Sequence, residues 1–123
     1  MKIRIKGNSI RYRLTKTEIA DFGKNGYLEE RTEFLNGTSF YYCLEKKSGI
    51  DNLHASFSDS RITVYVPEGI SHEWTTTNEV GYNYTMPLSN GKELFLLIEK
   101  DFVCLDHTFE DQSDNYPNPN KTC

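Results

Sequence analysis

Short runs of alternating apolar and polar residues predict a chain built mostly from strands. In residues 10–14 every second side chain is apolar, and the two side chains between them are arginines. A strand over these residues would therefore have one apolar face and one charged face. A similar run recurs at 62–66. Residues 2–6 and 53–57 precede these runs across short polar turns, so each pair predicts an antiparallel hairpin.

Two short helices are predicted directly after these hairpins. Thr15 and Glu18 have the spacing of a capping box, and Pro67 suits the first turn of a helix. The apolar side chains that the two helices would bury are Ile19, Phe22, Ile70 and Trp74. Each helix is therefore expected to be amphipathic and to cover the sheet that precedes it.

Two further hairpins follow the helices. Asn36-Gly37 and Asn90-Gly91 are strong turn signals. The strands predicted around them are 27–35 with 39–47, and 80–88 with 93–100. Pro87 lies late in its strand and cannot donate a ladder hydrogen bond, so we expect an edge or a bulge there.

The chain thus repeats one β-β-α-β-β unit. The segments 10–14 and 62–66 are 52 residues apart, and the segments after the two Asn-Gly turns are 54 residues apart. One unit has too little apolar face to be stable alone, whereas two can interleave their hairpins and cover each other. We expect an α+β, mostly β fold with a pseudo-twofold, barrel-like body closed to remove exposed strand edges.

These patterns define one domain with three parts: repeat 1 (1–47), repeat 2 (53–101) and an irregular C-terminal extension (102–123). The chain's 123 residues suffice to bury a core without metals or disulfides. The predicted core is Ile10, Leu14, Ile19, Phe22, Phe40, Tyr42, Leu44, Ile62, Val64, Val66, Ile70, Trp74, Leu94, Leu96 and Ile98. Cys43 is expected to lie in the core as well.

Charge and hydropathy narrow the setting. The net charge is −4, no stretch has the ~20 apolar residues of a membrane span, and the N-terminus lacks the apolar core of a signal peptide. We therefore expect a cytoplasmic protein without a membrane partner. Residues 2–16 hold six basic residues and no acidic one, so the rest of the chain carries a net charge of −10.

The basic N-terminal hairpin is a candidate nucleic-acid site. Its side chains would contact phosphates, and those at the loop tip would reach base edges. The candidate residues are Lys2, Lys6, Asn8, Arg11, Arg13 and Lys16. The alternative is a solvated outer face whose cations pair with Glu29, Glu30 and Glu33 of the following strand.

The C-terminal extension offers a candidate metal site. Cys104 and His107 have the Cys-x-x-His spacing of half a zinc site, and Cys123 could add one thiolate. A Cys104–Cys123 disulfide is a second interpretation, and an apolar Cys104 beside a solvated acidic tail is a third. We expect no other cofactor.

The β-β-α-β-β unit resembles the swapped-hairpin modules of AbrB- and SpoVT-type bacterial regulators, and the tandem arrangement resembles the MraZ family. Those families have a Gly-Arg, a short apolar strand and a helix-opening Pro. Ser60-Arg61-Ile-Thr-Val-Tyr-Val-Pro67 is similar but longer. The resemblance covers element order over residues 1–101 and implies DNA binding through the first hairpin.

The chain also resembles a family of small uncharacterised bacterial proteins. The similar parts are Met1-Lys-Ile-Arg-Ile-Lys-Gly-Asn-Ser-Ile10, Glu99-Lys-Asp-Phe-Val-Cys-Leu-Asp106 and Glu110-Asp-Gln-Ser-Asp-Asn-Tyr-Pro-Asn-Pro119. This resemblance spans nearly the whole chain and implies membership of a family without a known activity.

Two functions follow as hypotheses. The first is a non-catalytic binding module that engages another protein or a small ligand through Tyr-rich and acidic surfaces. The second is a single-chain DNA-binding transcriptional regulator that uses the basic hairpin. The sequence has no Gly-rich phosphate loop, Gly-x-Ser-x-Gly or His-Glu-x-x-His motif. We therefore do not expect an enzyme.

Overall fold

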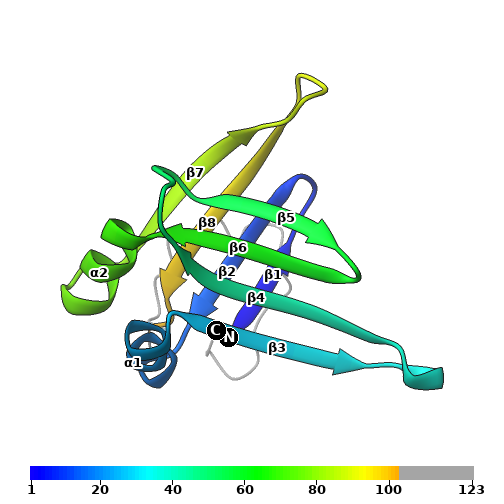
Figure 1. The fold of residues 1–123 in the computed structure, drawn as a ribbon, viewed down its shortest axis with the longest axis horizontal. Helices are drawn as coiled ribbons and strands as arrows, with labels where there is room; N and C mark the ends of the chain where they lie inside the picture. Colours follow the sequence, from blue (N-terminus) through cyan, green and yellow to red (C-terminus); the bar gives the residue numbers. More distant parts are fainter. Residues whose placement is uncertain (103–123) are drawn as a thin grey trace, which may run out of the picture.

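The computed structural model describes residues 1–102 and contains the predicted order of elements twice. The first unit consists of β1 (Lys2–Ile5), β2 (Ser9–Leu14), α1 (Lys16–Asn25), β3 (Tyr27–Glu33), the 3-10 turn η1 (Leu35–Gly37) and β4 (Ser39–Lys47) (Figure 1). The second unit consists of β5 (His54–Ser58), β6 (Arg61–Pro67), α2 (Glu68–Thr76), β7 (Gly81–Pro87) and β8 (Glu93–Lys100). The prediction of a mostly β fold with a duplicated unit is confirmed.

The two units exchange their second hairpins. One sheet has the strand order β1-β2-β8-β7, and the other has the order β3-β4-β6-β5. The central pairs, β2 with β8 and β4 with β6, are parallel, while the other pairs are antiparallel. Each sheet therefore joins the first hairpin of one unit to the second hairpin of the other.

The strand registers carry the internal symmetry of the sequence. Tyr12 pairs with Ile98 between β2 and β8, and Val64 pairs with Leu44 between β6 and β4. Val64 lies 52 residues after Tyr12, and Ile98 lies 54 residues after Leu44. Because the two sequence offsets map one parallel pairing onto the other, the two halves are related by a pseudo-twofold axis.

The predicted closure into a barrel is wrong. The two sheets stay separate, and β1, β7, β3 and β5 are their edge strands. From the end that carries the helices, the two sheets diverge toward their hairpin tips (Figure 1). The edges of the first sheet are protected in another way, because β1 has only four residues and Pro87 ends the edge strand β7, as its position predicted.

The core lies between the two sheets and beneath the helices. Phe22 of α1 and Trp74 of α2 meet edge to face, with ring centroids 6.2 Å apart. Tyr12 and Tyr42, one from each sheet, have centroids 5.9 Å apart. Of the predicted core, ten members are buried: Leu14, Ile19, Phe22, Leu44, Ile62, Val64, Val66, Trp74, Leu96 and Ile98. Cys43 is buried too.

The remaining predicted core residues are only partly buried, and they pack against the core from its margin: Ile10, Phe40, Tyr42, Ile70 and Leu94. Ile10, Phe40 and Leu94 lie near the hairpin ends of their strands, where the sheets diverge. Four buried residues were missing from the predicted core: Met1, Tyr12, Leu53 and Ala55. Two of them, Met1 and Leu53, are equivalent positions just before the first strand of each unit.

Local signals fix the helix boundaries. The Thr15 hydroxyl accepts from the Glu18 amide, and the Glu18 carboxylate accepts from the Thr15 amide at 2.9 Å, which forms the predicted capping box. Gly26 ends α1 in the left-handed region, with φ of 69°. Within residues 1–102, neither helix has the length and apolar character needed to cross a membrane.

Candidate functional site

The predicted basic site forms a block of cations on the outer face of the first hairpin. Lys2 pairs with Arg13, and Arg4 pairs with Arg11, across the β1–β2 ladder. Like charges placed directly opposite each other repel. The block therefore needs anions nearby, and their source decides how much positive charge is left for a ligand.

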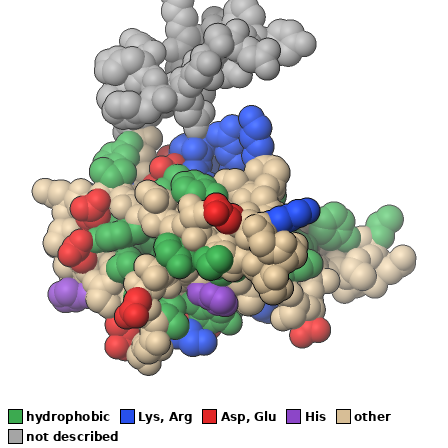
Figure 2. All heavy atoms as spheres, turned by 90° about the horizontal axis from the view of Figure 1, so that it is seen from above, with side chains coloured by type: hydrophobic (Ala, Val, Ile, Leu, Met, Phe, Trp, Pro, Cys, Tyr) green, Lys and Arg blue, Asp and Glu red, His purple; other side chains and the backbone are tan. Residues whose placement is uncertain are grey.

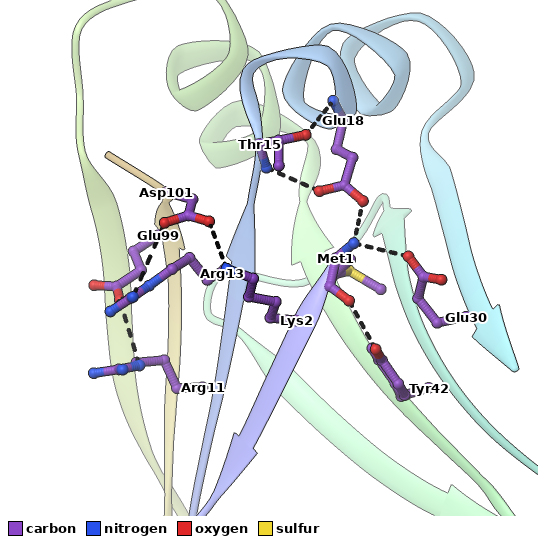
Figure 3. A network of polar contacts seen from close by, with 10 residues as sticks. All are labelled: Met1, Lys2, Arg11, Arg13, Thr15, Glu18, Glu30, Tyr42, Glu99 and Asp101. Carbon is purple, nitrogen blue, oxygen red and sulfur yellow. Dashed lines mark hydrogen bonds and ion pairs between the residues drawn. The ribbon is translucent and has the colours of Figure 1, made fainter. Parts of the chain in front are cut away.

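Two acidic residues at the end of β8 supply those anions (Figure 3). Glu99 accepts from Arg13 Nε at 3.0 Å and Nη2 at 2.9 Å, and it lies 3.3 Å from Arg11 Nε. Asp101 accepts from Lys2 at 3.2 Å and lies 4.0 Å from Arg13 Nη1. Three of the predicted phosphate contacts are thus already engaged in ion pairs.

The predicted pairing of these cations with Glu29, Glu30 and Glu33 is wrong. Glu29 pairs with Arg61, and Glu33 pairs with Arg31. The physical reason is the exchange of hairpins, because it places β8 beside β2 and moves β3 into the other sheet.

The other candidate residues lie at opposite ends of this hairpin. Asn8, in the β1–β2 turn, donates its amide to the Glu93 carbonyl at 2.6 Å. Lys6 is exposed at the same turn, while Lys16 is exposed at the start of α1, beyond the far end of β2. The structure therefore gathers Lys2, Arg11 and Arg13 but leaves Lys16 apart from the tip.

The predicted zinc site lies outside the described residues, because Cys104, His107 and Cys123 all fall after residue 102. Within residues 1–102, no three His, Cys, Asp or Glu side chains gather as metal ligands would. Zinc in the C-terminal extension stays a prediction, and elemental analysis of the purified full chain tests it.

A polar corner around Met1 was missed by the sequence analysis (Figure 3). The Met1 amine forms ion pairs with Glu18 and with Glu30, the latter at 2.7 Å. The Met1 carbonyl accepts from the Tyr42 hydroxyl at 2.7 Å. Because Met1 is only 8% exposed, this corner places a charged group at the edge of the core and joins β1 to α1, β3 and β4.

The charges of this corner stabilise each other. Burial by itself lowers the pKa of the Met1 amine, but its hydrogen bonds to Glu18 and Glu30 outweigh burial and hold the pKa above its ordinary value of 8.0. Burial by itself raises the pKa of the Glu18 carboxyl, but the amine and Thr15 outweigh it and hold the pKa below its ordinary value of 4.5. Both groups are therefore charged in neutral solution.

A second polar cluster was also missed and joins three strands of the other sheet. Arg61 Nη1 donates to Cys43 Sγ at 2.8 Å and to the Tyr27 hydroxyl at 3.1 Å, and it pairs with Glu29. The hydrogen bond to Glu29 raises the pKa of Arg61, and the hydrogen bond from Arg61 lowers the pKa of Glu29. The guanidinium also lies over the Tyr41 ring, 4.3 Å from its centroid. These contacts hold Arg61 against the fully buried Cys43.

The chain belongs to a family of unknown function, DUF7009, whose model matches residues 1–120. This confirms the resemblance to an uncharacterised family. Neither the curated proteins nor the solved structures include a match to this chain. The resemblance to AbrB-, SpoVT- and MraZ-type regulators therefore has no named relative behind it.

Proposed function

We propose that this member of a family of unknown function is a non-catalytic binding module that holds an apolar segment of another protein between the diverging ends of its sheets. The observation that carries the proposal is a pair of equivalent exposed residues. Ile5 is 54% exposed and Phe57 is 69% exposed, and they lie 52 residues apart at the hairpin ends of β1 and β5. Both halves of the molecule thus present a large apolar side chain at the equivalent position of their first hairpin.

The direction of these side chains supports the proposal. Because side chains alternate along a strand, Ile5 lies on the opposite face of β1 from Arg4, and it pairs with Ile10. Phe57 pairs with the buried Ile62. Because side chains two apart in a strand share a face, Phe57 lies on the same face as the buried Ala55. The inner faces of the sheets therefore continue outward from the core as apolar surface.

Further apolar side chains are exposed at another hairpin tip of the second sheet. Phe34 is 62% exposed and Leu35 is 86% exposed, both at the tip of the β3–β4 hairpin. In the view of Figure 2, hydrophobic side chains lie in the middle of the face and at its right end, with acidic side chains scattered among and around them. Apolar surface left in water is unfavourable by about 25 cal/mol per Å², so a partner that covers it gains that free energy.

A selection of displayed peptides against the full chain tests the proposal. We expect apolar peptides whose affinity falls at least tenfold with Ile5→Ser and with Phe57→Ser. Val80→Ser is the matched control, because Val80 is 49% exposed but lies at the other end, between α2 and β7. Peptides that bind both hairpin variants as tightly as the parent chain would refute this use of the hairpin ends.

A DNA-binding regulator is the second candidate function. It is favoured by the four cations of β1 and β2 that share one outer face, with Lys6 and Asn8 at the adjoining tip. Glu99 and Asp101 oppose it, since they neutralise part of that charge. A regulator requires duplex affinity that falls steeply with salt and is lost on Arg11→Glu or Arg13→Glu. The binding module requires only weak, non-specific DNA affinity in an electrophoretic shift at physiological salt.

A further inference from the structure

A pocket of about 400 Å³ lies between the two helices. Its walls come from equivalent positions of the two units but differ in chemistry. The wall from α1 is Ile19, Ala20 and Gly23, and the wall from α2 is Ser71, His72 and Thr75, each 52 residues later. One side of the pocket is therefore small and mostly apolar, whereas the facing side is polar.

Charges of both signs complete the lining. Lys46 of β4 and Glu68 at the start of α2 line the pocket. Within residues 1–102, neither the Lys46 ammonium nor the Glu68 carboxylate forms an ion pair or side-chain hydrogen bond. Lys100, which is equivalent to Lys46, instead donates to the carbonyl of Thr77 at the end of α2, at 2.8 Å. Lys100 thus uses its ammonium group within the fold, whereas the ammonium group of Lys46, at the pocket, can still donate hydrogen bonds to a ligand.

We propose that this pocket binds a small zwitterion of the α-amino acid class. Lys46 binds the carboxylate, Glu68 binds the ammonium group, and Ile19 and Ala20 contact a short aliphatic side chain. A volume of about 400 Å³ falls at the small end of ligand pockets, which suits such a molecule. Thr75 lines the pocket and donates its hydroxyl proton to the Ser71 carbonyl at 2.8 Å, so its oxygen could serve a ligand only as an acceptor.

A second pocket of similar size lacks the cation that the proposed ligand requires. It has a volume of about 430 Å³, and its charged lining residues, Asp51 and Glu73, are both acidic. No lysine or arginine lines it, so it offers no cationic side chain to a carboxylate. Of these two pockets, only the one between the helices combines a cation, an anion and a small apolar wall.

The first experiment titrates the full chain with free L-alanine, L-valine and L-leucine while backbone amide shifts are followed by NMR. We expect saturable shifts at Ala20, Gly23 and His72, and none at Asp51. For L-valine, 3-methylbutanoate lacks the ammonium group and isobutylamine lacks the carboxylate. Each analogue should bind at least tenfold more weakly, since each loses one charge-assisted contact. Absence of saturable shifts with all three amino acids, or equal binding of an analogue, would overturn the proposal.

Variants test which residues hold the ligand. Lys46→Met and Glu68→Gln should each weaken L-valine binding at least tenfold, and Ala20→Leu should abolish it by filling the pocket from an exposed helix position. Lys47→Met is the matched control, because it removes the same charge one residue away, where Lys47 lies over the Tyr65 ring. Unchanged binding in Lys46→Met, or an equal loss in Lys47→Met, would contradict the assignment.

This inference does not depend on the proposed function. The helices and the hairpin tips lie at opposite ends of the fold (Figure 1). Phe57→Ser should therefore weaken peptide binding at least tenfold and leave L-valine binding unchanged. Ala20→Leu should abolish L-valine binding and leave peptide binding unchanged. Each proposal can consequently fail alone.

Discussion

Two equivalent corners of this molecule are filled in opposite ways. At one corner the Met1 amine pairs with Glu18 and Glu30, and Tyr42 binds the Met1 carbonyl. At the other, the sequence offsets place apolar or aromatic residues at every equivalent position. The equivalent pairs are Met1 with Leu53, Glu18 with Ile70, Glu30 with Tyr84 and Tyr42 with Leu96.

The difference shows that the fold itself does not require the polar network. Leu53 is 2% exposed and Leu96 is fully buried, so the apolar corner is at least as well packed as the charged one. Replacing a buried ion pair with apolar side chains is often neutral or stabilising, whereas removing one partner is costly. We therefore expect the apolar corner to be indifferent to pH and the charged corner to depend on each of its members.

The largest expected loss of stability comes from creating a cavity in the apolar corner. Leu53→Ala removes a buried side chain and leaves a cavity, so it should lower the free energy of unfolding by about 2–5 kcal/mol. Urea unfolding followed by circular dichroism measures this change. Leu35→Ala is the control: Leu35 is 86% exposed, and its truncation should alter stability by less than about 0.5 kcal/mol. Similar losses in both variants would contradict the assigned packing.

A smaller loss is expected when the charged corner loses one partner. Glu18→Gln keeps a side chain that can serve the capping box but removes the charge facing the Met1 amine. We expect a loss of about 1–2 kcal/mol, below the range for a fully buried pair because the Glu18 side chain is 23% exposed. Glu33→Gln, at a side chain 66% exposed, should change stability by less than about 0.5 kcal/mol in the same urea assay.

The pH dependence of stability should also distinguish the two corners, with a smaller effect than these substitutions. The pKa of Glu18 is lowered on folding, so its stabilisation is present above 4.5 and is lost as pH falls through the folded pKa. The pKa of the Met1 amine is raised, so its stabilisation is present below 8.0 and is lost as pH rises through the folded pKa.

Urea midpoints measured from pH 3 to pH 11 should therefore decline at both ends. In a Glu18→Gln, Glu30→Gln double variant, the alkaline decline assigned to this corner should disappear. If stability still declines equally at alkaline pH in that variant, groups outside this corner cause the decline. The double variant with Leu53 intact is informative because it leaves the apolar corner as it was.

The smallest effect on stability is expected on the outer faces of the sheets. Glu99 faces Arg13 across β2–β8, while the equivalent Glu45 faces Tyr65 across β4–β6. Glu99→Gln should lower stability by about 0.5–1 kcal/mol, and Glu45→Gln by less. If the block of cations on the first hairpin binds DNA, Glu99→Gln should also strengthen DNA binding in the electrophoretic shift. Glu45→Gln should not.

Local signals account for what could be predicted from the sequence. The Thr15 and Glu18 spacing, the Asn-Gly turns and the offsets of 52 and 54 each depend on neighbours in the chain or on repetition, and the structure has all of them. The order of elements and most of the core follow from them. Glu18 was predicted as a cap for the same reason.

Long-range placement could not be predicted in the same way. The ion pairs of Arg13 depend on which hairpin lies beside β2, and the acids of the next strand in the sequence, such as Glu30, belong to the other sheet. The amine of Met1 has no periodicity that points to Glu30. Barrel closure was inferred from the need to protect strand edges, but the short β1 and Pro87 in β7 protect the edges of one sheet without closure.

The exchanged hairpins also have a consequence for how the chain can be divided. Each sheet takes two strands from residues 1–47 and two from residues 54–100, and only the segment between β4 and β5 joins the halves covalently. A cut at Gly49 therefore severs no strand pairing. Co-expressed fragments on either side of it should reassemble into the intact body, while either fragment alone lacks the parallel partners of its central strands.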